Sequence, residues 1–185
     1  MPRGIAHTTL LEHGITAVDT EYDRPLQDAS HLIVEEGRAA FVDTGVNDSV
    51  PLLLDALAQQ ELSPADVDFV FVTHVHLDHA GGAGTLMQHL PNARCVLHPR
   101  GAPHMIDPTK LVAGTEAVYG KEKTREIYGE IRPIDEQRVV VARSQAVAPW
   151  LLLIAGCPRQ VGNAVHRGRP DHPVGDRRGD DRPPV

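Results

Sequence analysis

The chain has 185 residues, 41% of them hydrophobic, and a formal net charge of -7. That length suits one compact domain with its own apolar core. The negative charge argues against a nucleic-acid partner and gives no attraction to anionic membranes. Residues 1–13 lack the apolar stretch of a secretory signal, and the longest apolar run, 150–157, is far too short for a membrane helix. We therefore expect a cytoplasmic protein.

Strands and helices are predicted to alternate along the chain. Strands are expected at 30–34, 39–43, 68–73, 93–98 and 138–141. Helices are expected at about 51–60, 82–90 and 116–129, with a single helical turn at 63–66. This alternation indicates the α/β class.

The sequence changes character after Val141. Residues 142–185 hold seven Arg and no Lys, together with six Pro and five Gly. From residue 158 onward there is no apolar periodicity that would form a core. We expect a domain over 1–141 and a divergent, largely disordered tail over 142–185. The change suits either a reading-frame shift in a GC-rich gene or a natural divergent tail.

Metal-ligand side chains are concentrated directly after the third expected strand, the apolar segment 68–73. His74, His76, Asp78 and His79 fall within six positions and precede two glycines. Imidazole nitrogens and carboxylate oxygens are common zinc ligands. Residues two apart on extended chain share a side, so His74 and His76 can face one metal. The following turn lets the other two approach a second metal.

The segment 73–82, THVHLDHAGG, is similar to the HxHxDHxGG motif of the metallo-β-lactamase superfamily. Asp43-Thr44-Gly45 resembles the DTG that ends a strand in that family, and the resemblance covers about 31–141. It implies an αββα sandwich, of which this chain holds a complete N-terminal half. Asp43 would orient a ligand histidine from outside the metal shell; the alternative is a turn-forming Asp.

The resemblance also implies a dinuclear zinc hydrolase. His74 and His76 would bind the first Zn²⁺ and Asp78 and His79 the second, with Asp78 also acting as the catalytic residue that hydrogen-bonds the attacking metal-bound hydroxide. The partner would be a small molecule: an ester, thioester, lactone or related carbonyl compound. Glyoxalase-II-like and lactonase-like enzymes share the motif, so it does not choose between them.

Other candidate residues receive weaker interpretations. His98 is expected to be structural. Lys110, in an expected loop at 107–111, either meets an anionic substrate or is simply solvated. The single histidines His7, His13, His31, His89 and His104 are expected not to bind metal, and His89 to face solvent.

The further ligands of the family are not found where they are expected. Residues 151–160 contain no histidine, and His166 and His172 stand in Arg/Pro/Gly-rich sequence without a strand to hold them. A second hypothesis is therefore a truncated, catalytically silent member with weak or no metal binding. A third is a redox relative with two irons, which the motif disfavours because such proteins usually carry Glu near the position of Leu77.

Overall fold

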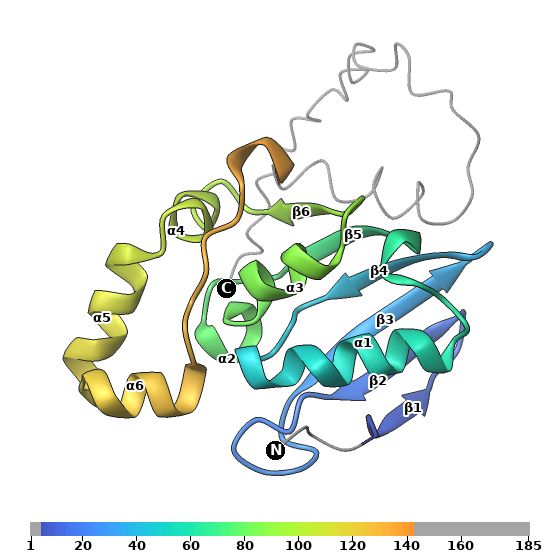
Figure 1. Cartoon of the computed structure of the whole chain (residues 1–185), viewed down its shortest axis with the longest axis horizontal. Coiled ribbons are helices and arrows are strands. Elements are labelled where there is room, and N and C mark those ends of the chain that lie inside the picture. The colour runs from blue at the N-terminus through green and yellow to red at the C-terminus, as the bar shows by residue number, and fades with distance from the viewer. Residues whose placement is uncertain (1–4, 143–185) are drawn as a thin grey trace, which may run out of the picture.

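The computed structural model describes residues 5–142, which fold around one seven-stranded sheet (Figure 1). Its strands lie side by side in sequence order: β1 (Thr8–Leu10), β2 (Ile15–Asp19), β3 (Ala29–Glu35), β4 (Arg38–Val42), β5 (Val67–Val72), β6 (Arg94–Leu97) and β7 (Val139–Val141). Strands β1 to β4 pair antiparallel, and β4 to β7 pair parallel. Because parallel neighbours need long crossovers, the helices lie between the later strands.

The helices are α1 (Val50–Gln59), α2 (Leu77–Ala80), α3 (Ala83–His89), α4 (Ala102–Ile106), α5 (Thr109–Tyr119) and α6 (Lys121–Tyr128). Short 3-10 turns occupy Asn47–Ser49, Pro64–Asp66 and Glu136–Arg138. α1 and α3 lie over the same face of the sheet, while α5 and α6 extend beyond its edge (Figure 1). The predicted α/β class and all five predicted strands are confirmed.

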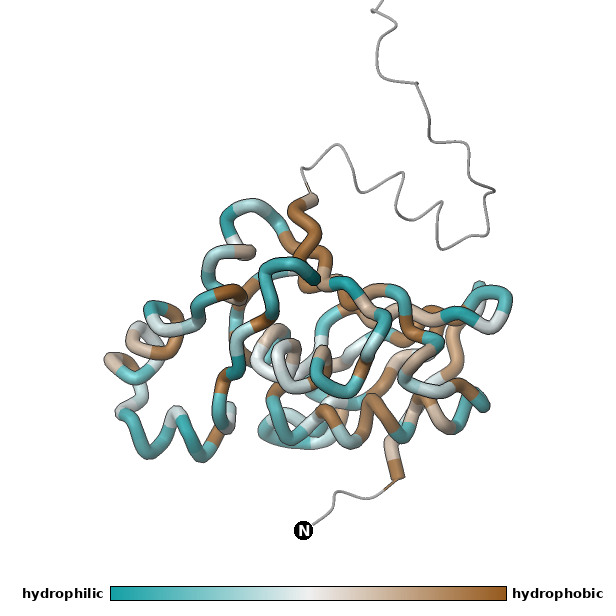
Figure 2. Tube along the Cα trace, turned by 45° about the horizontal axis from the view of Figure 1, so that its top comes forward, coloured by the Kyte–Doolittle hydropathy of each residue, from teal (hydrophilic) through white to brown (hydrophobic). Residues whose placement is uncertain are grey.

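The core lies between the sheet and the helices α1 and α3. One row of strand side chains, Val18, Leu32, Phe41 and Val70, is completely buried against apolar residues of these helices such as Leu53. Each such side chain stabilises the fold by about 1.5–3 kcal/mol. Along the chain trace, hydrophobic and hydrophilic segments alternate at short intervals (Figure 2).

The sequence did not predict the first two strands. β1 and β2 form an antiparallel hairpin at the edge of the sheet, with Thr8 opposite Val18. On β2 the buried positions include polar residues, Thr16 and Asp19. Strand β2 therefore lacks the alternation of apolar and polar residues by which a half-buried strand is recognised in a sequence.

The helical prediction for 116–129 was wrong in its bounds. The structure has two helices, separated by Gly120, whose φ of 82° lies in the left-handed region. A residue in that conformation ends an α-helix, and glycine adopts it without a steric penalty. The predicted loop at 107–111 is also corrected, because α5 begins at Thr109 and includes Lys110. The short helices α2 and α4 were not predicted.

No helix in the part of the chain that the structure describes is long and apolar enough to cross a membrane. The tail expected over 142–185 lies outside the described residues from 143 onward, and so do His166 and His172.

Candidate metal centre

Two neighbouring parallel strands bring the candidate residues together. β4 ends at Val42 and β5 at Val72, so Asp43 and Thr73 leave the sheet at the same edge. The carboxyl ends of parallel strands are the usual place for a binding site. Asp43 has a φ of 59°, a conformation that Asp tolerates better than most residues. Its backbone N–H still donates to the Phe71 carbonyl at 2.8 Å, which ties the turn to β5.

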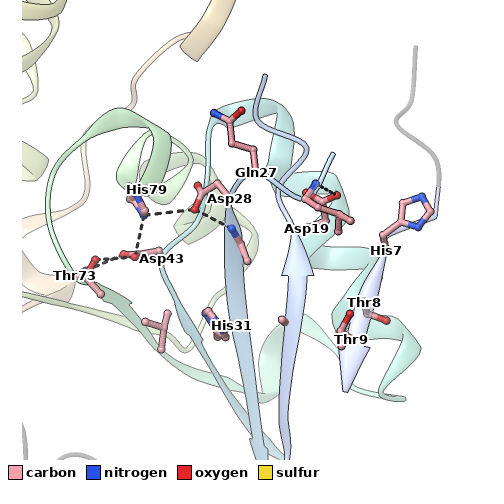
Figure 3. Close-up of a pocket in the computed structure, with 14 residues that line it drawn as sticks. His7, Thr8, Thr9, Asp19, Gln27, Asp28, His31, Asp43, Thr73 and His79 are labelled. Carbon is pink, nitrogen blue, oxygen red and sulfur yellow. Dashed lines mark hydrogen bonds and ion pairs between the residues drawn. The ribbon is translucent and has the colours of Figure 1, made fainter. Parts of the chain in front are cut away.

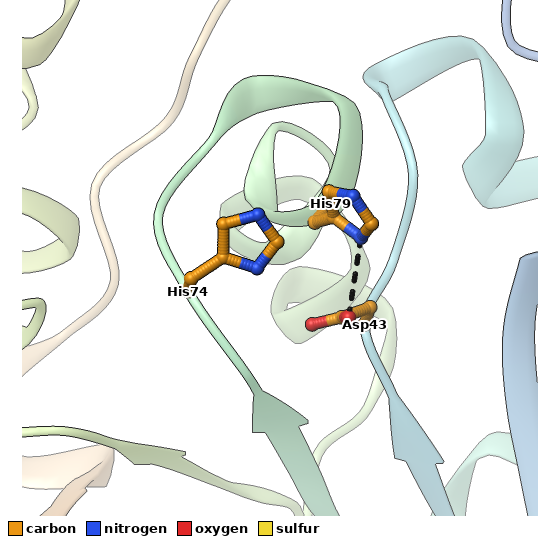
Figure 4. Close-up of side chains that lie close together, drawn as sticks. All are labelled: Asp43, His74 and His79. Carbon is orange, nitrogen blue, oxygen red and sulfur yellow. Dashed lines mark hydrogen bonds and ion pairs between the residues drawn. The ribbon is translucent and has the colours of Figure 1, made fainter. Parts of the chain in front are cut away.

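Three side chains form a group of donors suited to a metal ion (Figure 4). Asp43, His74 and His79 each offer a ligand atom, and these atoms lie within 4.8 Å of one another. The His76 ring lies edge-on to the His74 ring, with centroids 4.8 Å apart. Asp78 Oδ2 lies 3.6 Å from His79 Nε2. The four motif residues therefore lie around one site. The compact donor group, however, consists of only two of them, His74 and His79, together with Asp43.

Asp43 is the hub of a hydrogen-bond network that fixes the two histidines. Its Oδ1 accepts from the Thr73 N–H at 2.8 Å, and its Oδ2 accepts from the Thr73 hydroxyl at 2.7 Å. A hydroxyl that donates its one proton to Asp43 can only accept from His74 Nδ1, 3.0 Å away. His79 Nδ1 lies 3.3 Å from the same Asp43 oxygen. Assigned from this pattern, both rings carry their proton on Nδ1 and leave Nε2 free for a ligand.

Asp28 is a further carboxylate at this centre that the sequence did not single out. Its Oδ1 accepts from the Ala29 N–H at 2.8 Å and lies 3.9 Å from His79 Nδ1 (Figure 3). Its Oδ2 is buried and has no hydrogen-bond partner among the described residues. Burial raises the pKa of the Asp28 carboxyl, and the nearby His79 acts in the opposite direction. An orphaned carboxylate oxygen beside a histidine is the environment that a cation or a bound water would complete.

The backbone around α2 holds His79 in place. Both the N–H and the hydroxyl of Thr44 donate to the His79 carbonyl, at 2.7 and 3.0 Å. The Gly82 N–H donates to the Gly45 carbonyl at 2.8 Å. A Cβ at Gly82 would lie 2.8 Å from the Val46 carbonyl oxygen, so this close approach requires glycine. The motif glycines therefore pack the ligand turn directly onto the Asp43-Thr44-Gly45 turn.

Three cavities border the centre. One, of about 680 Å³, is lined by Asp28, Asp43 and His79 together with polar residues of β1 to β3 such as His31 (Figure 3). A second, of about 270 Å³, is lined by His74 and by the turn that contains His98. A third, of about 300 Å³, is lined by His76, Asp78 and tyrosines.

The remaining candidates differ in where they lie. His98 Nδ1 accepts from the Arg100 N–H at 3.2 Å, which gives it a contact within its own turn. Lys110 is exposed on α5, and His89 is exposed on α3, as predicted for His89. His31, which was expected not to bind metal, reaches the 680 Å³ cavity as a lining residue.

Comparison with known proteins decides the family. The sequence profile of the metallo-beta-lactamase superfamily matches residues 23–159. The chain belongs to this superfamily. Hydroxyacylglutathione hydrolase from Salmonella paratyphi A is 35% identical over 80 residues, which make up 41% of this chain and 30% of that protein. The corresponding enzyme from Salmonella newport is 34% identical over 79 residues. The matched part of the chain is thus similar to part of two hydrolases.

Solved metallo-beta-lactamases share the fold. The Cronobacter sakazakii enzyme with the HARLDQ motif is 21% identical, with a TM-score of 0.53 over 76% of this chain and 47% of its own. MEM-A1, a subclass B3 enzyme from a soil metagenome library, is 18% identical, with a TM-score of 0.54 over 75% of this chain and 47% of its own. The chain thus spans about half the length of these solved proteins and about a third of the hydroxyacylglutathione hydrolase.

Proposed function

We propose that this chain is a zinc-dependent hydrolase of a small ester, thioester, lactone or related carbonyl compound. The observation that carries the proposal is the donor group of Asp43, His74 and His79, bordered by His76 and Asp78 at the edge of the sheet. The likeness to a hydrolase of the thioester hydroxyacylglutathione supports the carbonyl substrate class. The cytoplasmic location expected from the sequence belongs to the same proposal.

The residues present fit a divalent metal by their chemistry. Imidazole nitrogens and carboxylate oxygens are good ligands for zinc, and the hydrogen bonds to Asp43 and Thr73 leave Nε2 of His74 and His79 free. His74 and His76 would hold one metal ion, and Asp78 and His79 a second. When bound, a divalent ion makes hydroxide available at neutral pH and polarises a carbonyl group.

The protein's own groups prepare the site for that chemistry. Asp43 and Thr73 fix the orientation of His74 and His79 before any ligand arrives, so little reorganisation is needed on binding. We assign Asp43 to this positioning role, because both of its oxygens already accept hydrogen bonds. Asp78 is half-buried, lies 3.6 Å from His79 and lines the 300 Å³ cavity. We assign it to accept a proton from a water molecule at the centre.

A catalytically silent member of the superfamily is the second candidate. A catalytic zinc site uses three protein ligands for each metal. Among the described residues, the motif supplies two histidines for one metal and one Asp and one His for the other. This count favours weak zinc binding and little turnover.

Metal analysis and a hydrolysis screen test the proposal. The full chain is dialysed against zinc, its metal content is measured, and thioesters, esters and lactones are tested with the wild-type protein and with His76→Ala. We expect zinc retention and thioester or ester hydrolysis that the substitution reduces by at least about 100-fold, as for loss of a metal ligand. Asp68→Asn, a substitution in an exposed ion pair with Arg38, is the matched control that leaves both unchanged.

Two outcomes would decide against the hydrolase. Zinc retention without hydrolysis of any compound, or hydrolysis that survives His76→Ala, would favour the silent member or a contaminant. Iron in place of zinc, with reduction of a small molecule, would favour the redox alternative.

A further inference from the structure

All three tyrosines of the chain meet beside the candidate metal centre. The sequence holds three Tyr in total, and Tyr22, Tyr119 and Tyr128 all line the cavity of about 300 Å³ that His76 and Asp78 also line. They come from three separate places: the loop between β2 and β3, the end of α5 and the end of α6. We call this cavity the tyrosine pocket.

Two of the tyrosines form a fixed wall. The rings of Tyr22 and Tyr128 stack with centroids 6.2 Å apart and an interplanar angle of 19°, and their hydroxyl oxygens are 3.3 Å apart. Tyr128 is only 7% exposed, and it packs with Val46 and Leu77. This pair also fastens α6 to the β2–β3 loop, so its packing has a structural purpose of its own.

Tyr119 is different, because packing does not explain it. Its ring meets Tyr128 edge-on with centroids 6.4 Å apart, yet the residue is 52% exposed and lines the pocket. An exposed aromatic side chain that lines a cavity offers a surface for a ligand's apolar group. The neighbouring Val118 is 75% exposed but does not line the pocket.

The residues that line the tyrosine pocket determine which chemical groups it can bind. Among the described lining residues there is no Lys or Arg, and Asp78 contributes the one carboxylate. A carboxylate or phosphate would gain no cationic partner here. A cavity of about 150 Å³ can hold a benzene molecule, so about 300 Å³ admits a phenyl ring or a short acyl chain.

We propose that the tyrosine pocket binds the uncharged apolar or aromatic acyl group of the substrate and so sets the substrate class of this hydrolase. The inference rests on the proposed function. An acyl group that packs against Tyr119 and Tyr128 in this cavity would have its carbonyl end beside His76 and Asp78, where the reaction would occur.

A series of p-nitrophenyl esters tests the pocket on the zinc-supplemented full chain. We expect kcat/KM to be higher for the phenylacetyl ester than for the acetyl ester. Tyr119→Ala should lower that ratio by about tenfold, the scale of lost apolar contact in a substrate pocket. Tyr119→Phe should retain the ratio because the ring remains, and Val118→Ala is the matched control that leaves it unchanged. A ratio unaffected by Tyr119→Ala would overturn the assignment.

A binding measurement separates the pocket from the proposed function. Phenylacetone is an uncharged ketone that cannot be hydrolysed, and its contact with the protein is followed by ligand-observed NMR, with acetone as the comparison. We expect saturable binding of phenylacetone that Tyr119→Ala removes and Tyr119→Phe keeps. If no ester is hydrolysed, the proposed function fails and this binding alone supports the pocket. Absence of saturable binding overturns the pocket whatever the activity.

Discussion

At the scale of the residue, Asp43 links the fold to the candidate centre. Its carboxylate accepts two hydrogen bonds from Thr73 and faces His79 Nδ1. Because the Thr73 hydroxyl donates its proton to Asp43, it can only accept from His74 Nδ1, which sets the tautomer of the His74 ring. The sequence predicted this positioning role from the DTG resemblance. It did not predict Asp28, because an isolated Asp in a polar loop carries no spacing signal.

Asp43→Asn should weaken zinc binding by about 10–100-fold, the usual cost of losing a partner that orients a ligand histidine. Asn tolerates the left-handed backbone at this position, so the turn should survive. The change removes the charge and replaces one of the two accepting oxygens by an NH2 donor. Competition with a chromophoric chelator measures the affinity, and circular dichroism checks the fold. Unaltered zinc affinity in a folded variant would remove Asp43 from the centre.

At the scale of the element, the strands of the parallel half were predictable, whereas the helices beyond the sheet edge were not. β5 is a nearly continuous apolar run, so its sequence signal is strong. α5 has no buried residue along its length, so it lacks the apolar stripe by which a helix is recognised. The break at Gly120 is set by one backbone angle, which periodicity does not register.

The contact between the motif turn and the Asp43-Thr44-Gly45 turn makes a prediction about two glycines. Gly82→Ala should destabilise the protein by about 1–3 kcal/mol, because its Cβ would press on the carbonyl oxygens of Val46 and Thr44, at 2.8 and 3.1 Å. Gly114→Ala, on α5 with nothing within 4 Å of a new Cβ, should instead stabilise the helix by up to about 1 kcal/mol. Urea unfolding measures both. Equal effects of the two substitutions would contradict the packing described for Gly82.

At the scale of the whole molecule, the tertiary fold brings together residues that no sequence pattern connects. Tyr22 is far in sequence from Tyr119 and Tyr128, and the three share no motif, so only the docking of α5 and α6 beside the β2–β3 loop makes a pocket of them. The motif residues, by contrast, lie within one short segment and could be recognised directly.

Zinc should stabilise the whole fold, because the donor group is assembled only when β4 and β5 are paired. A ligand that binds only the folded state adds about 2.7 kcal/mol at 100 times its Kd. Thermal unfolding followed from micromolar to millimolar zinc should show a rising midpoint, and His74→Ala should abolish the rise. Identical midpoints in zinc and in a chelator would show that the described residues do not bind the metal.

The change from antiparallel to parallel pairing at β4 has a consequence for the order of folding. The pairs on one side of β4 are local, such as Glu35 with Arg38, whereas those on the other join distant segments, such as Val42 with Phe71. Closing the longer loops costs more chain entropy, so we expect the β1–β4 meander to be established before β5 docks. Asp43 and His74 lie on opposite sides of that boundary. Capture of a metal ion would then follow the formation of the meander, and it would report that β5 has docked onto β4.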